Sequence, residues 1–138
     1  MLDWHMPSRL YAVHHLGKIL LWTSIPCTGG SPWQNINEHY YRKYNNVEAL
    51  NRLLGLWKNF KDLLAKWMIV ADAVVARNGI VAIELPKRCK CWYDRRVHKY
   101  LSKFKQIYEG NIHGCAYGLE NSKGIPLFKP WVVKSTTE

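Results

Sequence analysis

The stretch Lys18–Gln34, KILLWTSIPCTGGSPWQ, decides the fold that this sequence predicts. Its first part, residues 19–22, is a short apolar run with the β-branched and aromatic content of a buried strand. The run breaks at Pro26, and Cys27 follows with a loop of small residues, Thr28, Gly29, Gly30 and Ser31. Because glycine takes positive φ at little cost, Gly29 and Gly30 are free to adopt that conformation in a turn. Open α/β sheets bind ligands at this carboxyl end of their strands.

The length and composition of the chain describe one folded domain with a basic surface. Its 138 residues are enough to bury a core, and 48% are hydrophobic and 22% charged. We therefore treat residues 1–138 as a single α/β domain. Twenty Lys and Arg against ten Asp and Glu leave a formal charge of +10, which favours nucleic acid as a partner. Colloidal solubility and an acidic protein partner are the alternative explanations of the charge, and the sequence leaves a homo-oligomer open.

The pattern of cysteines and the length of the apolar segments indicate in which cellular compartment the protein is expected. Four cysteines, at positions 27, 89, 91 and 115, do not form the pattern of a disulfide framework. We expect reduced thiols and an intracellular protein, cytoplasmic or nuclear, without a secretory signal. The longest apolar segment, residues 67–76, is interrupted by Asp72 and is too short to span a membrane. We expect no membrane association.

A long amphipathic helix follows the opening stretch. Apolar residues recur at spacings of three and four from Val47 to Ala71, which predicts a helix over about 46–77 with this stripe in the core. Asn45 or Asn46 can cap its start, and Asn78-Gly79 supplies a left-handed exit.

A second apolar run, residues 80–84, follows the helix and stops at Pro86. Strand, helix and strand form a βαβ unit, so the two strands should pair in parallel with their carboxyl ends at one edge of the sheet. Residues 8–17, between Ser8 and Gly17, predict a short helix. The full prediction is an α/β, Rossmann-like half-sheet of about four strands, near 18–25, 79–85, 107–116 and 127–134. Most of its strands are expected to be parallel, with helices packed on them.

The segment from Lys87 to Lys105 contains eight Lys or Arg residues and one acid, Asp94. Apolar residues at helical spacing predict a helix over about 93–105 with one basic side. Phosphate contacts are predicted for Lys87, Arg88, Lys90, Arg95, Arg96 and Lys99. A merely solvated face is the alternative. Residues 34–46 interleave tyrosines with bases, which suits stacking on nucleic-acid bases or, equally, a surface loop or helix start.

Two residues at the predicted strand ends are candidates for chemistry. Cys27 can act as a nucleophile if its pKa is depressed, although a free cysteine is also a common core residue. Glu84 ends an apolar run, where a carboxylate is costly to bury unless it is paired, for example with Arg88, or solvated in a cleft. Cys89, Cys91, His113 and Cys115 offer soft ligands, but their spacing is tighter than that of usual zinc sites. We predict no metal site.

Several of these motifs together resemble the later half of the cytosine-5 DNA methyltransferases. They are Ser24-Ile25-Pro26-Cys27, Glu84-Leu85-Pro86, Tyr117-Gly118-Leu119 and Lys129-Pro130-Trp131-Val132-Val133, spread over residues 19 to about 135. The resemblance implies that Cys27 is the nucleophile and Glu84 contacts the cytosine, that S-adenosylmethionine is the cofactor, and that the last strand inserts antiparallel between the second and third. The paired turns are also similar to segments in polyproteins of mobile genetic elements.

The sequence departs from that family in ways that shape the functional prediction. Thr28 replaces the Gln that follows the nucleophile, and the family's cofactor-binding first half has no counterpart. We therefore predict a degenerate, methyltransferase-like domain that binds nucleic acid, DNA or RNA, without independent catalysis. One alternative is part of an S-adenosylmethionine-dependent methyltransferase that needs a separate N-terminal half. Another is a structural interaction module that exposes Trp33, Trp92 and Trp131.

Overall fold

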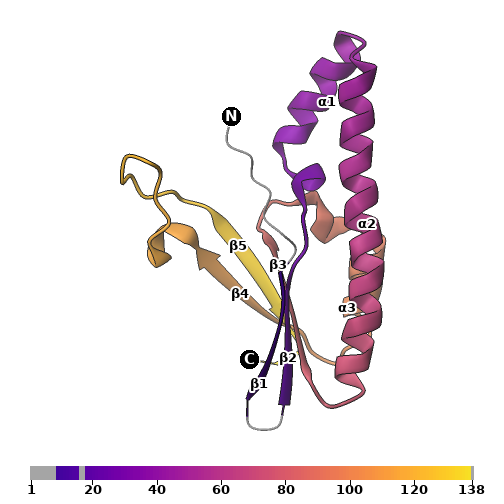
Figure 1. Ribbon diagram of the computed structural model, residues 1–138, viewed down its shortest axis with the longest axis vertical. Helices are drawn as coiled ribbons and strands as arrows, with labels where there is room; N and C mark the ends of the chain where they lie inside the picture. The colour runs from indigo at the N-terminus through magenta and orange to yellow at the C-terminus, as the bar shows by residue number, and fades with distance from the viewer. Residues whose placement is uncertain (1–8, 16–17, 138) are drawn as a thin grey trace.

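A five-stranded mixed sheet with helices packed against it forms the domain, in a computed structural model that describes residues 9–15 and 18–137. The strand order is β1-β2-β3-β5-β4 (Figure 1). In chain order the elements are β1 (Arg9–His15), β2 (Lys18–Ser24), η1 (Thr28–Gly30), α1 (Trp33–Lys43), α2 (Val47–Val75), β3 (Ile80–Pro86), η2 (Lys90–Tyr93), α3 (Arg95–Leu101), β4 (Tyr108–His113), η3 (Gly114–Tyr117) and β5 (Pro130–Ser135).

The predicted βαβ unit is present. Strands β2 and β3 pair in parallel from Leu20 opposite Ile80 to Ser24 opposite Glu84, with α1 and α2 in the connection. Strand β5 lies antiparallel between β3 and β4, as expected for the last strand, so β2, β3 and β4 run in one direction. The prediction that most of the sheet is parallel is wrong. Among the described strands three of the four pairings are antiparallel, because β5 opposes both of its neighbours and β1 adds a hairpin.

The segment before β2 is a strand, where the sequence predicted a helix. β1 forms an antiparallel hairpin with β2 from Arg9 opposite Ser24 to His15 opposite Lys18. A run of only seven residues fits helical and extended patterns about equally well, and pairing with the apolar β2 decides for the strand. The expected helix-capping residues, Ser8 and Gly17, lie outside the described residues.

Helix α2 provides one side of the core. The side chain of Asn46 accepts a hydrogen bond from the backbone of Ala49 at 3.0 Å, and Asn78 has the predicted left-handed φ of 56°. Residues of its lower half pack against β2, β3, β5 and α3, with Phe60, Leu64, Trp67 and Ala71 buried. No helix of the described part of the chain is both long and apolar enough to cross a membrane.

The upper half of α2 extends beyond the sheet. Val47 and Leu54, which the sequence placed in the core, are 64% and 65% exposed. The 29 residues of α2 span about 44 Å, whereas a seven-residue strand spans about 23 Å. Among the described elements, the first turns of α2 therefore have only α1 beside them, as the two helices at the top of Figure 1 show.

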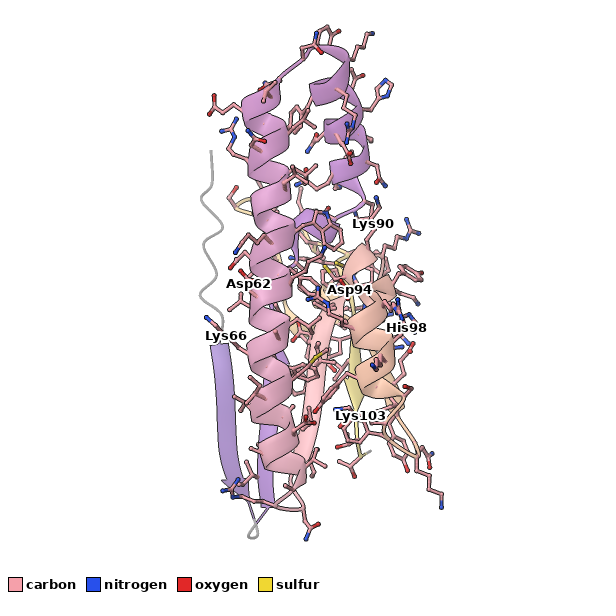
Figure 2. All side chains as sticks on the ribbon, turned by 90° about the vertical axis from the view of Figure 1, so that its right-hand side faces the viewer. Asp62, Lys66, Lys90, Asp94, His98 and Lys103 are labelled. Atoms are coloured by element: carbon pink, nitrogen blue, oxygen red, sulfur yellow. The ribbon has the colours of Figure 1, made fainter. Side chains whose placement is uncertain are left out.

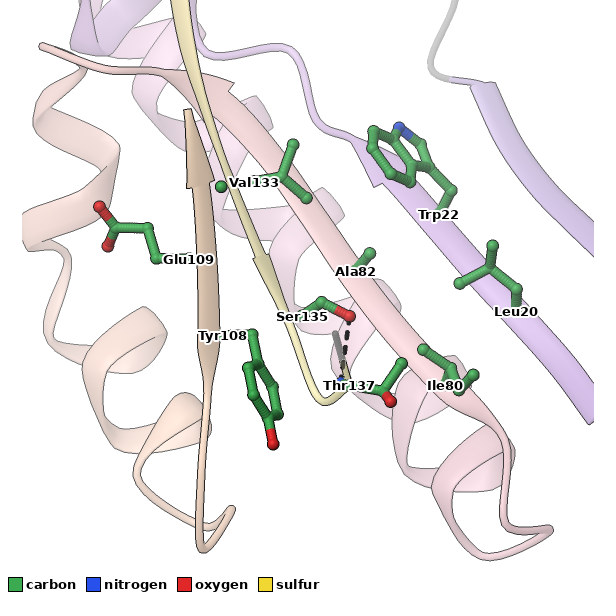
Figure 3. Close-up of a pocket in the computed structure, with 10 residues that line it drawn as sticks. Leu20, Trp22, Ile80, Ala82, Tyr108, Glu109, Val133, Ser135 and Thr137 are labelled. Carbon is green, nitrogen blue, oxygen red and sulfur yellow. Dashed lines mark hydrogen bonds between the residues drawn. The ribbon is translucent and has the colours of Figure 1, made fainter. Parts of the chain in front are cut away.

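The sheet has one helix-covered face and one face that is open in the described structure. Side chains alternate along β3, so Val81, Ile83 and Leu85 enter the core while Ile80 and Ala82 face the other way. On the open face a hollow of about 540 Å³ is lined by residues of β2, β3, β4 and β5, among them the apolar Leu20, Ile80 and Val133 (Figure 3).

Candidate functional site

The loop after β2 is a tight turn packed between α2 and η2. The Gly30 amide donates to the carbonyl of Cys27 at 2.9 Å, and the Ser31 amide donates to that of Thr28 at 3.2 Å. Gly29 and Gly30 are buried, and neither has the positive φ that the sequence suggested. The two glycines are needed for close approach. A Cβ on Gly29 would lie 3.2 Å from both Cβ of Leu56 and the backbone nitrogen of Trp57.

Gly30 also brings three cysteines together across 62 residues of sequence. A Cβ on Gly30 would lie 2.6 Å from Sγ of Cys91 and 2.8 Å from Sγ of Cys89. Sγ of Cys89 lies 3.7 Å from the carbonyl oxygen of Cys27, and the Cys91 amide donates to Sγ of Cys89 at 3.4 Å. Cys89 and Cys91 are buried, and Cys27 is half-buried at the edge of the same cluster. We call Cys27, Cys89 and Cys91 the thiol cluster.

The cluster favours a thiolate on Cys89, and not on Cys27. Hydrogen bonds from Cys27 and Cys91 lower the pKa of Cys89 to about 4. The same contact with Cys89, together with burial, raises the pKa of Cys27, although the positive charge of Lys129 acts in the opposite direction. The pKa of Cys91 is raised for the same reasons, led by its hydrogen bond to Cys89. Cys27 is therefore held protonated, the wrong state for a nucleophile.

The four residues considered as zinc ligands are not gathered into one site. Cys89 and Cys91 lie in the thiol cluster, whereas Cys115 is in η3 and His113 ends β4, where its ring stacks on Phe128 at 5.0 Å. Among the described residues no group of three or more His, Cys, Asp and Glu side chains is placed to hold a metal ion.

Glu84 is half-buried on the open face of the sheet. Burial raises its pKa, while a hydrogen bond from Trp22 and the charge of Lys129 act in the opposite direction. Trp22 takes the place that the sequence offered to Arg88, since no ion pair joins Glu84 to an arginine in the described structure. Glu84 and Cys27 belong to the ends of the parallel pair β2 and β3, but Cys27 packs against the core on the opposite face.

The predicted basic residues lie on η2, α3 and the loop before them. Lys87, Arg88, Lys90, Arg95 and Lys99 are exposed, and among the described residues none of the five forms an ion pair. Figure 2 shows Lys90, Asp94 and His98 along one side of the molecule, beside α2 and below α1. The helix is shorter than predicted, since Tyr93 belongs to η2 and α3 ends at Leu101. We call this surface the basic flank.

Arg96 is the one predicted contact that already has an acidic partner. Asp94 caps α3 by accepting from the Arg96 amide at 2.9 Å, and its carboxylate also accepts from the Arg96 guanidinium at 3.2 Å. Burial alone would raise the pKa of Asp94, but the hydrogen bonds and charge of Arg96 and the charge of Lys61 lower it. Lys61, on α2, therefore belongs to the basic flank. Sequence reasoning missed it because it is about 30 residues away from the basic segment.

Comparison of the chain with protein-family models, with curated proteins and with solved structures finds no match.

The tryptophans expected at an interface are not exposed together. Trp92 is only 8% exposed, because its indole nitrogen donates to the carbonyl of Pro86 at 3.2 Å and Lys134 covers its ring. Trp131 is half-buried under Lys129, whose Nζ lies 5.0 Å from the ring centroid. Trp33, at the start of α1, is 72% exposed. The tyrosine-rich segment that follows is helical, from Trp33 to Lys43.

Proposed function

We propose that this domain binds nucleic acid through the basic flank. The observation that carries the proposal is a run of exposed cations on η2 and α3, of which Arg95 and Lys99 share one side of a helix. Cations held near a rigid scaffold without acidic partners attract phosphates and release counterions when they bind. The formal charge of +10 supports the same partner.

We propose different roles for the residues of the basic flank. Lys87, Arg88 and Lys90 lie at or just beyond the end of β3, and Arg95 and Lys99 project from α3. These five are proposed to contact phosphates, whereas Arg96 mainly holds Asp94 in its capping position. Such contacts position a nucleic acid without reading its sequence. The proposal is therefore binding without base preference from the flank alone.

A charge-removal experiment tests this proposal. Affinity for a labelled oligonucleotide is measured by fluorescence polarisation between about 50 and 200 mM salt. The double variant Arg95→Gln/Lys99→Gln should bind roughly tenfold more weakly at the lower salt, and the salt slope should fall by about 1.5. The control Arg77→Gln/Lys123→Gln removes the same charge at exposed sites outside the flank. It should change the affinity far less.

Two results would overturn the proposal. One is the absence of any binding at low salt. The other is an equal loss of affinity in both double variants, which would mean that net charge and not the flank sets the interaction. Circular dichroism of each variant checks that α3 remains folded.

A methyltransferase component is the second candidate, and three observations favour it. Strands β2 and β3 bring the turns at Cys27 and Glu84 to the same edge of the sheet, and the charge of Lys129 acts on both groups. The order β2-β3-β5-β4 with β5 antiparallel is the arrangement that the methyltransferase resemblance implies. The apolar open face also offers a surface on which a missing layer could pack.

The cofactor-binding first half of the methyltransferases has no counterpart in the sequence. In the described residues a hairpin strand, β1, precedes β2. In this candidate, the Cys27 thiol must first lose its proton before its sulfur adds to a pyrimidine ring, Glu84 hydrogen-bonds to that ring, and a second polypeptide holds the cofactor. Trapping with a mechanism-based pyrimidine analogue in the presence of such a partner tests it. A covalent adduct that disappears in Cys27→Ser supports the candidate, and no Cys27-dependent adduct rejects it.

A further inference from the structure

An aromatic stripe lies exposed along α1. Trp33, Ile36, Tyr40 and Tyr44 are 72%, 50%, 50% and 68% exposed, and their spacing of three and four residues places them along one side of the helix. No residue of α1 is buried, so the helix presents this stripe without a covering element in the described structure. A contiguous exposed apolar surface of this kind marks an interaction site.

We infer that the stripe binds the bases of single-stranded nucleic acid. The inference rests on the nucleic-acid binding proposed above and adds the class of substrate. The rings of Tyr40 and Tyr44 are parallel to within 3°, with centroids 6.3 Å apart, and Nζ of Lys43 lies 5.5 Å from the centroid of Tyr44. Proteins bind single-stranded nucleic acid with flat aromatic rings bordered by cations, since the bases stack on the rings and the phosphates contact the cations.

The stripe adjoins the basic flank through a contact that is part of the fold. Gly30 packs against Cys89 and Cys91, so the first turn of α1, three residues later, starts beside η2. Figure 2 shows Lys90 between the start of α1 and α3. Tyr93, in η2, is 77% exposed and adds an aromatic side chain to this junction. From Trp33 to Tyr44 the stripe extends the flank by about 17 Å.

The charges on α1 favour a polyanionic occupant over another protein chain. The one acid of the helix, Glu38, is paired with Arg42 at 2.7 Å, which leaves His39 and Lys43 beside the aromatic stripe. A duplex offers phosphates but keeps its base faces stacked inside, so it would use the flank and leave the stripe unused. A single strand can occupy both surfaces.

The test compares a single strand with a duplex of the same length. Affinity is measured for an oligothymidine of about 12 nucleotides and for a hairpin duplex, both fluorescently labelled. Tyr40→Ala/Tyr44→Ala should weaken single-strand binding roughly tenfold to a hundredfold and leave duplex binding unchanged. The salt slope should stay the same, because stacking releases no counterions. The matched control Tyr40→Phe/Tyr44→Phe keeps the rings and should bind within about twofold of the native chain.

Other outcomes separate this inference from the proposal on which it rests. Equal affinity for both oligonucleotides, with no loss in the alanine variant but a loss in Arg95→Gln/Lys99→Gln, would overturn the stripe and leave the flank intact. No binding at all would remove both. Self-association that depends on Tyr40 and Tyr44, without single-strand binding, would identify a protein interface and overturn the inference. If α1 unfolds in the alanine variant, Tyr40→Leu/Tyr44→Leu keeps the helix and removes the flat rings.

Discussion

The thiol cluster and the basic flank are neighbours in space, yet their side chains are used in opposite ways. Cys89 and Cys91 of the cluster are buried together with the adjoining Gly30; the turn amides donate to turn carbonyls, and the Cys91 amide donates to Sγ of Cys89. On the flank, Lys90, Arg95 and Lys99 are exposed, and no described acid pairs with them. The thiol cluster, whose Cys27 turn resembles a catalytic motif, is therefore largely inaccessible to a partner. The basic flank, which contains no such motif, is accessible.

This difference shows that a cysteine in a glycine-rich turn is not a nucleophile by its sequence context alone. Cys27 has the sequence context of a nucleophile, but its pKa is raised because its thiol bonds to Cys89 in a half-buried position. The glycines beside it admit sulfur atoms and the backbone of α2 instead of a ligand. A reactive cysteine needs the opposite environment, with access and a depressed pKa.

The largest expected effect is the difference in thiol-labelling rate between Cys115 and the buried cysteines of the thiol cluster. In the folded chain Cys115 should react readily with iodoacetamide, whereas Cys89 and Cys91, 1% and 0% exposed, should react only when the structure opens. For a domain of ordinary stability this opening slows the reaction on the order of a thousandfold. Mass spectrometry of timed samples measures it, and urea should equalise the four cysteines. Rapid labelling of Cys89 without urea would show that the cluster is open.

Substitution of the glycines tests close packing at the cluster directly. Gly30→Ala should destabilise the fold by about 1–3 kcal/mol, because the new Cβ would lie 2.6 Å from Sγ of Cys91. Gly55→Ala, on the exposed side of α2 with nothing within 4 Å, should stabilise by about 0.5–1 kcal/mol. Urea unfolding gives both free energies. A Gly30→Ala variant as stable as the native chain would mean that the turn does not need this approach.

The thiolate on Cys89 should make stability depend on pH. Its pKa is about 4 in the folded chain and has an ordinary value of 9.0, so between these values the unfolded chain binds a proton that the folded chain does not. The stability from Cys89 is therefore complete above about pH 9 and is lost as the pH falls toward 4. From about pH 5 to 8.5 the native chain should gain stability steadily relative to Cys89→Ala, by at most about 1.4 kcal/mol for each pH unit.

The control for this pH dependence is Cys115→Ala, which leaves the thiol cluster intact. The free energy of unfolding of this variant should change with pH in the same way as that of the native chain. The raised pKa values of Cys27 and Cys91 act in the other direction above pH 9, since the folded chain then keeps protons that the unfolded chain loses. A free energy of unfolding that is the same for the native chain and Cys89→Ala at all pH values would argue against a thiolate.

The parts of the fold that local chemistry specifies were predictable. Asn46 and Asn78 mark the ends of α2 by capping and by left-handed φ, and the apolar runs on either side of it define the parallel pair β2 and β3. The antiparallel position of β5 agreed with the arrangement implied by the methyltransferase resemblance. The β1 hairpin was missed because a seven-residue segment takes its conformation from its neighbour.

The candidate site was less predictable, since it depends on contacts between distant segments. Nothing in the spacing of Cys89 and Cys91 indicates that Cys27 lies beside them, or that Gly30 makes room for their sulfurs. The exposed basic residues were found from composition because charge at the surface needs no partner. Lys61 was not found, because its place beside Asp94 depends on how α2 packs against α3.

The smallest expected effect concerns Asp94, whose amide donates to the carbonyl of Cys91 in the thiol cluster and whose carboxylate caps α3 and pairs with Arg96. Asp94→Asn keeps an acceptor for the Arg96 amide, now at 2.9 Å, so stability should change by less than about 0.5 kcal/mol. It removes the charge that holds the Arg96 guanidinium at 3.2 Å. Arg96 is then available for a phosphate, and affinity for an oligonucleotide should rise about threefold, with a salt slope steeper by about 0.7–0.9.

The control variant Glu120→Gln makes the same change of charge in the turn before β5, which Figure 1 places across the sheet from α3. An equal rise in both variants would show that net charge is sufficient, and a rise in Asp94→Asn alone would place Arg96 in the interface.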